Sequence, residues 1–490
     1  MAYRVHLVNM TPKSRSAETN QDSEPSITVD PRNADVIVGT AFTPNPSGGA
    51  DAPFYMSTDR GDTWALITTL PGNGPFGTSD ITMSFDGSGR FLYAGYLLGT
   101  TVALNVDRTP NPTTGAMTVL EGRGNEDQPY TKGTTVQRGP DTGEDRLYVG
   151  NNDFSMPAGR TATIDVSLDS GTAAPVFNSF QIDTRPTSGQ DGPQVRPAIH
   201  PDGTVYAAFY GWRARAATIT TDVVVVRDDD WGKGASPFAS LIDPGDGKAG
   251  LRVVQGVTIV WNDYLGQERN AGNLAIAVDP IDSSRVYLVW CDGQVAAGTF
   301  ALHVRRSDDR GNTWSSTDLY TAPAATNVSL AVNKRGHVAL LYQQLTGPPA
   351  SQRWESHIQL SIDEGRTWRD HLLATVLAAV PAKTFDPYIG DYAMLVAHDD
   401  DFYAIFCANN TPDPANFPHG VRYQRNADFA TQQLFDLSGV TPVAPSIDPF
   451  FCRLWFHADG LEERRRLGEQ VVVRGLRYER IEIDELVVSS

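Results

Sequence analysis

The chain has 490 residues, and its 58 acidic side chains outnumber its 40 lysines and arginines, which gives a formal charge of −18 at pH 7. That charge argues against nucleic acid and anionic membranes as main partners, because both require a positive contact surface. The 40% hydrophobic fraction is enough for a large core and excludes a mainly disordered chain. The 44 glycines and 32 prolines have no short period, as in proteins with many short strands joined by turns.

The cysteines and apolar segments bear on the compartment. Cys291, Cys407 and Cys452 are odd in number and far apart, so they predict neither a disulfide framework nor a CxxC metal pair. The longest apolar stretch, 372–382, is too short to span a bilayer. The first 15 residues lack the apolar core of a secretory signal. We therefore expect a protein that is cytoplasmic as synthesised, with leaderless export or association with a particle as alternatives.

Seven strand–turn–strand segments follow one another along the chain. Each has two strand-like runs around a turn rich in Asp, Gly, Pro or Asn, which is the pattern of a β-hairpin. They span residues 26–42, 81–97, 130–152, 195–212, 274–290, 328–344 and 388–406.

An octapeptide of the form S-x-D-x-G-x-T-W occurs three times, at 57–64, 307–314 and 361–368. Its Ser and Asp oxygens can accept hydrogen bonds from turn amides, its Gly permits a positive φ, and Thr-Trp restarts a strand with a large ring to bury. We interpret it as a structural turn rather than a catalytic motif. The residues with this role are Ser57, Asp59, Gly61, Trp64, Ser307, Asp309, Gly311, Trp314, Ser361, Asp363, Gly365 and Trp368.

The hairpins and octapeptides keep a constant spacing. A distance of 37 residues separates Asp22 from Asp59, Gly272 from Asp309, and Thr326 from Asp363. A repeat that holds two hairpins corresponds to one four-stranded blade, and blades arranged radially form a β-propeller. We expect an all-β propeller over residues 22–437, with seven blades, or six because a long insertion precedes Gly272.

The octapeptides resemble the Asp-boxes, or bacterial neuraminidase repeats, of sialidase-like β-propellers, and the likeness covers about residues 20–437. The stretch Ile389-Gly390-Asp391-Tyr392 is similar to bacterial proteins labelled exo-sialidase-like. The resemblance implies the propeller fold. It implies an activity less specifically, because Asp-boxes also occur in xyloglucan hydrolases, sortilin-type receptors and a photosystem assembly factor.

The two ends of the chain depart from the repeat. Residues 1–21 are expected to form an N-terminal strand or arm, and residues 438–490 a short mixed C-terminal extension. Within the extension, 459–469 is a candidate short helix, whereas 471–473 and 481–488 are strand-like. The extension either closes the edge of the propeller or docks it to a larger assembly.

A ligand of a propeller usually meets the face where the innermost strands begin. One polar residue, mostly acidic, precedes each predicted inner strand, and together these residues would surround the mouth of the central channel. Alternatively, each residue only caps its own strand. The candidates for ligand binding are Asp22, Asp80, Asp127, Asp191, Arg196, Asn273, Asn327 and Asp386, with Glu24 and Glu126 beside two of them.

The resemblance to sialidases implies a substrate clamp of three arginines, a Tyr–Glu nucleophile and an Asp acid/base. The F/Y-R-I-P motif of the first arginine is absent from this chain, and no glutamate can be assigned to a tyrosine nucleophile. A glycosidase with two carboxylates could instead pair Asp80 or Asp127 with Asp386. The catalytic candidates are Asp80, Asp127, Asp386, Tyr388, Asp391 and Tyr392, although both tyrosines also suit a core role.

No cofactor or metal site is predicted, because the nine histidines lie too far apart for a metal pair. Calcium at the acidic turns 228–230, 243–246 or 399–401 is the alternative. An acidic mouth would repel the carboxylate of a sialic acid. The sequence therefore favours a non-catalytic recognition module for glycan or protein, tethered by its C-terminal segment, with a glycoside hydrolase as the alternative.

Overall fold

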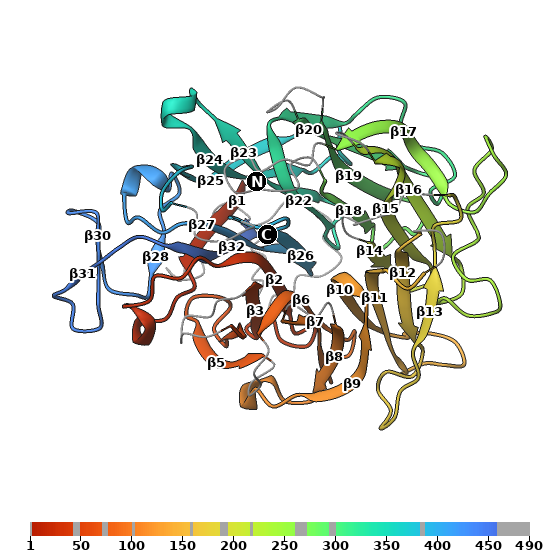
Figure 1. The fold of residues 1–490 in the computed structure, drawn as a ribbon, viewed down its shortest axis with the longest axis horizontal. Coiled ribbons are helices and arrows are strands. Elements are labelled where there is room, and N and C mark those ends of the chain that lie inside the picture. Colours follow the sequence, from red (N-terminus) through yellow and green to blue (C-terminus); the bar gives the residue numbers. More distant parts are fainter. Residues whose placement is uncertain are drawn as a thin grey trace, which may run out of the picture.

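The computed structural model describes residues 2–42, 50–70, 77–99, 103–156, 160–186, 195–215, 219–259, 272–293, 300–382 and 388–457. These residues form β-strands and four short 3-10 segments, with no α-helix in the described ranges. Seven sheets of four or five strands surround a central axis (Figure 1). The chain is therefore a seven-bladed β-propeller, and the prediction of fold class and of seven blades rather than six is confirmed.

Six blades have four antiparallel strands each, in sequence order from the axis to the rim. Blades 1 to 3 consist of β2 (Ser23–Val29), β3 (Ile37–Phe42), β4 (Ala52–Ser57) and β5 (Ala65–Leu70); β6 (Thr78–Phe85), β7 (Leu92–Leu98), β8 (Ala103–Thr109) and β9 (Thr118–Gly124); and β10 (Glu126–Thr135), β11 (Asp145–Asp153), β12 (Ala162–Ser167) and β13 (Asn178–Gln181). Blades 4 to 6 consist of β14 (Arg196–Ile199), β15 (Val205–Arg215), β16 (Ile219–Asp228) and β17 (Leu251–Ile259); β18 (Leu274–Val278), β19 (Val286–Gly293), β20 (Phe300–Ser307) and β21 (Tyr320–Pro323); and β22 (Ala325–Val332), β23 (Val338–Thr346), β24 (Arg353–Ser361) and β25 (Arg369–Leu377).

The seventh blade closes the ring with strands from both ends of the described chain. Its order is β26 (Met394–His398), β27 (Asp401–Asn409), β32 (Ile447–His457), β1 (Ala2–Asn9) and the short β28 (Arg422–Tyr423). Strand β1 pairs along its whole length with residues 450–457 of β32 in antiparallel fashion, so the first and last described segments are joined by backbone hydrogen bonds. Such pairing leaves no open sheet edge between the ends of the ring.

Both segments flanking the expected propeller, 1–21 and 438–490, therefore contribute a strand to the seventh blade. The boundaries at residues 22 and 437 stay a prediction for the whole chain. Between β28 and β32 the chain forms a small separate sheet of β29 (Ala427–Asp428), β30 (Gln433–Phe435) and β31 (Pro442–Val443), which projects from the rim (Figure 1). The expected helix at 459–469 and strands at 471–473 and 481–488 lie outside the described residues.

Hydroxyl side chains connect the inner strands of neighbouring blades. The amide of Phe85 in blade 2 donates to Thr28 Oγ1 in blade 1 at 3.1 Å, and the amide of Gly133 in blade 3 donates to Ser84 Oγ in blade 2 at 3.0 Å. The apolar core lies between successive blades, where Tyr206 and other residues of blade 4 pack on blade 5. The three cysteines are buried and free, as the sequence predicts.

The three octapeptides connect the third and fourth strands of blades 1, 5 and 6 with the same hydrogen bonds. In the last copy, Ser361 Oγ accepts from the Gly365 amide at 2.7 Å, and Asp363 accepts from the Thr367 amide at 2.8 Å and from its hydroxyl at 2.7 Å. The Trp368 ring nitrogen donates to the Gly365 carbonyl at 3.1 Å. Each carboxylate therefore bonds to its own turn, while the assignment as Asp-boxes stays a prediction.

Candidate functional site

The inner strands of four blades begin with a β-bulge at the same place, the face where these strands start. In each one, two residues lie between consecutive pairs with the second strand. Three of the bulged residues, Glu24, Gln128 and Asn327, have φ of 48°, 55° and 54°. Positive φ is strained for residues other than glycine, and bulges redirect side chains and are frequent beside functional sites. Because the bulged residues are polar, the repeated bulge places polar residues at the mouth of the channel.

Arg196, the first residue of β14, lies among side chains from other blades at this mouth. Its guanidinium carbon is 4.0 Å from the centroid of the Tyr130 ring and 5.2 Å from that of Tyr392. Arg196 is 4% exposed, and this burial lowers its pKa, while Tyr130, Tyr392, Asp80 and Glu24 act in the opposite direction. The four residues around Arg196 come from blades 1, 2, 3 and 7, so the guanidinium lies where many blades converge.

The segment Ile389-Gly390-Asp391-Tyr392 connects blade 7 with two other blades across the mouth. The Asp391 amide donates to Glu24 Oε1 at 3.1 Å, and Asn273 Nδ2 donates to the Asp391 carbonyl. Gly390 has φ of +95°, and a Cβ there would lie 2.3 Å from the Glu24 backbone nitrogen. Glycine is therefore required at this position, and the following Asp391 and Tyr392 are placed at the mouth by that close approach.

The two asparagines expected to bind ligand form a link between blades 5 and 6. Asn273 Oδ1 accepts from the Asn327 amide at 2.9 Å and from the Thr326 hydroxyl. Asn327 Nδ2 donates to Gln343 Oε1 at 2.8 Å. Asn273 and Asn327 are 1% and 0% exposed, so their polar atoms are engaged within the protein.

The remaining predicted residues fall into different places. Asp80, Arg196, Asp391 and Tyr392 gather with Glu24 at the mouth. The half-buried Asp127 lies at the start of β10 and accepts from the Gln128 amide at 3.0 Å.

Tyr388 and Asp22 lie outside this group. Tyr388 packs in the core and donates to the Pro381 carbonyl at 2.6 Å. Asp22 is fully buried beside Glu18 and Asp448. Asp191 and Asp386 lie outside the described residues.

Charge at the mouth is unbalanced toward the carboxylates. Burial raises the pKa of Tyr392 well above its usual value, and the charges of Glu24 and Asp80 raise it further, against the effect of Arg196. The phenol therefore stays protonated at neutral pH, which makes it a poor nucleophile unless a carboxylate accepts its proton. Two carboxylates, Glu24 and Asp80, therefore act on one guanidinium.

A second ionic cluster lies in blades 2 and 3, beside the start of β10. Arg123 contacts Glu126 at 3.0 Å, Asp153 at 2.7 Å and Asp165 at 2.8 Å. Burial raises the pKa of Glu126 to about 8, although Arg123 opposes that shift. Four strands supply these side chains, and sequence spacing gave no signal for their meeting. Tyr130 was also missed as a mouth residue, although the polar-Pro pairs at 24–25 and 128–129 mark two of the bulges.

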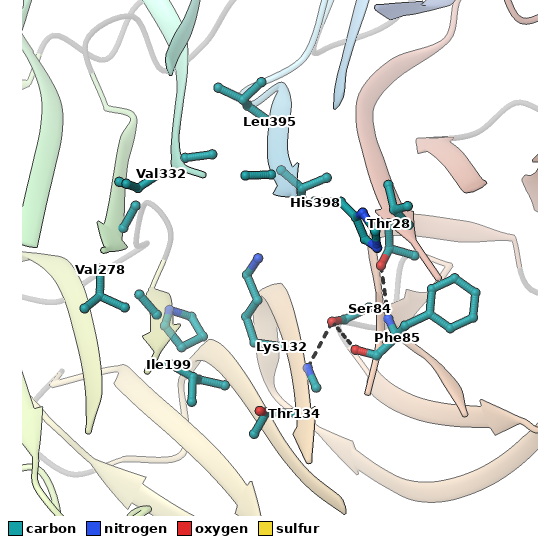
Figure 2. Close-up of a pocket in the computed structure, with 18 of the residues that line it drawn as sticks. Thr28, Ser84, Phe85, Lys132, Thr134, Ile199, Val278, Val332, Leu395 and His398 are labelled. Atoms are coloured by element: carbon teal, nitrogen blue, oxygen red, sulfur yellow. Dashed lines mark hydrogen bonds between the residues drawn. The ribbon is translucent and has the colours of Figure 1, made fainter. Parts of the chain in front are cut away.

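The opposite end of the inner strands surrounds a cavity of about 340 Å³. Figure 2 shows its wall, to which every inner strand contributes, including Ile199, Val278, Val332 and Leu395. The Lys132 side chain extends into this space. Aliphatic residues from several blades line this end together with Asp86, Lys132 and His398, and the described lining residues include no tyrosine and a single carboxylate.

Comparisons with known proteins establish no family. No family model matches the chain, and no curated protein matches it. Three similar solved structures are a GH93 α-L-arabinofuranosidase of Fusarium graminearum with arabinobiose (10% identity, 91% of this chain and 97% of that chain, TM-score 0.40), a puromycin hydrolase S511A mutant (10%, 81% and 52%, 0.41) and a PL25 ulvan lyase (12%, 80% and 92%, 0.37). These distant similarities do not assign a ligand or a reaction. No helix in the described ranges is long and apolar enough to span a membrane.

Proposed function

We propose that the protein is a non-catalytic recognition module that binds an uncharged glycan at the mouth of the propeller. The observation that carries this proposal is the convergence of Glu24 and Asp80 with the rings of Tyr130 and Tyr392 around Arg196. Carboxylates accept strong hydrogen bonds from sugar hydroxyls, and tyrosine faces offer a rigid apolar surface for a pyranose or furanose ring.

The charge of the mouth selects among sugars. A sialic acid or uronic acid brings a carboxylate, and the carboxylates of Glu24 and Asp80 beside Arg196 would repel it. Recognition of carboxylates normally uses guanidinium groups in a bidentate arrangement, whereas the Arg196 guanidinium lies against two tyrosine rings. A neutral oligosaccharide is therefore the ligand class that fits best.

A glycoside hydrolase is the second candidate, and one observation favours it. Tyr392 has Glu24 and Asp80 close enough to raise its pKa, which supplies the tyrosine–carboxylate combination that sequence alone could not assign. The raised pKa of Tyr392 counts against a nucleophilic role, because the phenol would have to lose its proton inside an acidic site.

A glycan array and a panel of fluorogenic glycosides, applied to the same protein, test both candidates. We expect binding to neutral glycans without turnover, and at least tenfold weaker binding for Asp80→Asn. Asp399→Asn is the matched control, because Asp399 lies in the turn between β26 and β27 at the opposite face, paired with Lys334 at 2.6 Å. If turnover is observed and disappears in Asp80→Asn or Tyr392→Phe but not in Asp399→Asn, the protein is a glycoside hydrolase rather than a recognition module. Binding only to acidic glycans would contradict the proposed ligand class.

A further inference from the structure

A buried acidic cluster lies where the ring closes, apart from the mouth. Glu18 and Asp22 belong to the segment between β1 and β2, and Asp448 lies in β32. Carboxylate oxygens of the three residues lie within 4.8 Å of one another. Asp22 and Asp448 are 0% exposed. Residues from opposite ends of the sequence thus bring three carboxylates together at the junction of blades 7 and 1.

One of these carboxylates is already compensated. Asp448 accepts from Arg425 Nη1 at 2.9 Å, from Asn9 Nδ2 at 2.7 Å and from Asn410 Nδ2 at 2.7 Å. Against its burial, Arg425 and these amides hold the pKa of Asp448 below its usual value. Arg425 also lies 3.3 Å from Glu18 Oε1. A single guanidinium therefore faces three carboxylates, and Asp448 is the one that it neutralises.

Asp22 has no such compensation. Neither of its carboxylate oxygens has a hydrogen-bond partner within the described part of the chain, and the same holds for the fully buried hydroxyl of Tyr55 on β4. The two groups are close, because the charge of Asp22, after burial itself, is the largest contribution that raises the pKa of the Tyr55 phenol. A buried carboxylate without a partner is strongly unfavourable. Two unpartnered, fully buried polar groups therefore share one location, and the carboxylate of Asp22, when ionised, needs a positive partner.

We propose that Glu18 and Asp22, with the Tyr55 hydroxyl beside them, bind a hard divalent cation of the calcium class that locks the closure of the propeller. All the candidate ligands are oxygens, and calcium–oxygen bonds of about 2.3–2.6 Å suit oxygens that lie within 4.8 Å of each other. Asp448 supplies the third negative charge at the edge of the site. With all three carboxylates ionised, they and Arg425 leave a charge of −2, which a divalent cation balances.

This site differs from the acidic turns that the sequence offered for calcium. At those turns the carboxylates face basic side chains: Asp243 contacts Arg252 at 2.8 Å, and Asp399 contacts Lys334 at 2.6 Å. Asp22 faces the charges of Glu18 and Asp448 instead, with Arg425 the opposing charge, and burial followed by these two carboxylates raises its pKa well above the usual value. A cation is therefore most needed at the closure.

The test uses the full chain, dialysed against EDTA and then titrated with CaCl2, MgCl2 or TbCl3. We expect one Ca²⁺ per chain by calorimetry, a higher melting temperature with Ca²⁺, and terbium emission sensitised by tyrosine. The proposal would be overturned if none of the three cations changed the melting temperature of the wild-type protein or gave a heat of binding in calorimetry.

Two variants and a matched control locate the site. Asp22→Asn should weaken Ca²⁺ binding at least a hundredfold, and Tyr55→Phe, which keeps the packing of the ring, should lower affinity and terbium emission. Asp230→Asn removes an exposed carboxylate from an acidic turn and should keep both. If Asp22→Asn fails to fold, Tyr55→Phe decides. Unchanged affinity in Tyr55→Phe, or loss in Asp230→Asn, would place any cation elsewhere and reject this site. Glycan binding at the mouth is read out separately, so the two proposals fail independently.

Discussion

The two ends of the inner strands use the same seven strands for opposite purposes. At the end opposite the mouth, which we call the lower end, regular β-pairing presents aliphatic side chains such as Ile199, Val332 and Leu395 around the cavity. At the mouth, bulges with positive φ and the close approach of Gly390 hold Glu24 and its neighbours in strained positions. Regular packing is what stabilises a fold, whereas strain that surrounding structure maintains is typical of sites that bind. The difference between the ends therefore supports the mouth as the site.

Removing the positive charge of the mouth should have the largest effect. Arg196→Met keeps much of the side-chain volume but leaves Glu24 and Asp80 near each other without the guanidinium and ends two contacts with tyrosine rings. We expect a loss of about 3–4 kcal/mol in the free energy of unfolding, measured by urea denaturation at pH 7.5. The double variant Arg196→Met/Asp80→Asn should recover part of this loss. If the double variant is less stable than Arg196→Met, the carboxylates are not the reason for the cost.

Truncating one aliphatic side chain at the lower end should cost less. Leu395 is 3% exposed and lines the cavity as part of the core between blades 6 and 7. Leu395→Ala should lower the free energy of unfolding by about 2–3 kcal/mol, toward the lower end of the usual range because a cavity already borders the site. Glycan affinity should stay within about twofold of wild type. A tenfold loss of binding would show that the lower end takes part in recognition.

Much of the fold follows from local patterns. Alternating apolar residues with turn residues predict each hairpin, and the 37-residue spacing predicts how the hairpins group into blades, because both signals are short-range. The closure of the ring is different. The pairing of Ala2–Asn9 with Ile447–His457 joins residues hundreds of positions apart, and the sequence of neither strand indicates which strand it pairs with. Topology of this kind follows from the closed ring rather than from either segment.

The sequence predicted the location of the candidate site better than it predicted which residues line it. Asp80 and Arg196 both lie at the mouth, but the rule that selects a polar residue before each inner strand points to Asp191 rather than Arg196 in blade 4. The same rule failed to separate Asp22, which is buried at the closure, from Glu24 two residues later, because a bulge changes which of neighbouring residues faces which side. Tyr388 and Tyr392 have similar sequence surroundings, yet one donates to the Pro381 carbonyl and the other contacts Arg196.

The octapeptide turns should respond differently from the mouth. Asp363→Ala removes the acceptor for the Thr367 amide and hydroxyl and should lower the free energy of unfolding by about 1 kcal/mol without changing glycan affinity. The hydrogen bonds from Thr367 lower the pKa of Asp363 to about 2, so the difference from wild type should be full above pH 4 and disappear as the pH falls toward 2. A variant that loses binding but keeps its melting temperature would assign this turn to the ligand site.

The smallest effect should come from Glu126, beside the mouth, and should appear as a change in pH dependence. Burial raises the pKa of Glu126 to about 8 from the unfolded value of 4.5, so the folded state holds a proton that the unfolded state lacks between these values. The stability contributed by that proton is therefore full below pH 4.5 and declines as the pH rises through 8. Glu126→Gln keeps a neutral side chain beside Arg123 at every pH, so the melting temperature of the variant should fall less than that of wild type between pH 5 and pH 9. If differential scanning calorimetry shows the same dependence of melting temperature on pH for the variant and for wild type, Glu126 is ionised in the folded protein. The cluster around Arg123 would then hold a further ionised carboxylate beside the guanidinium.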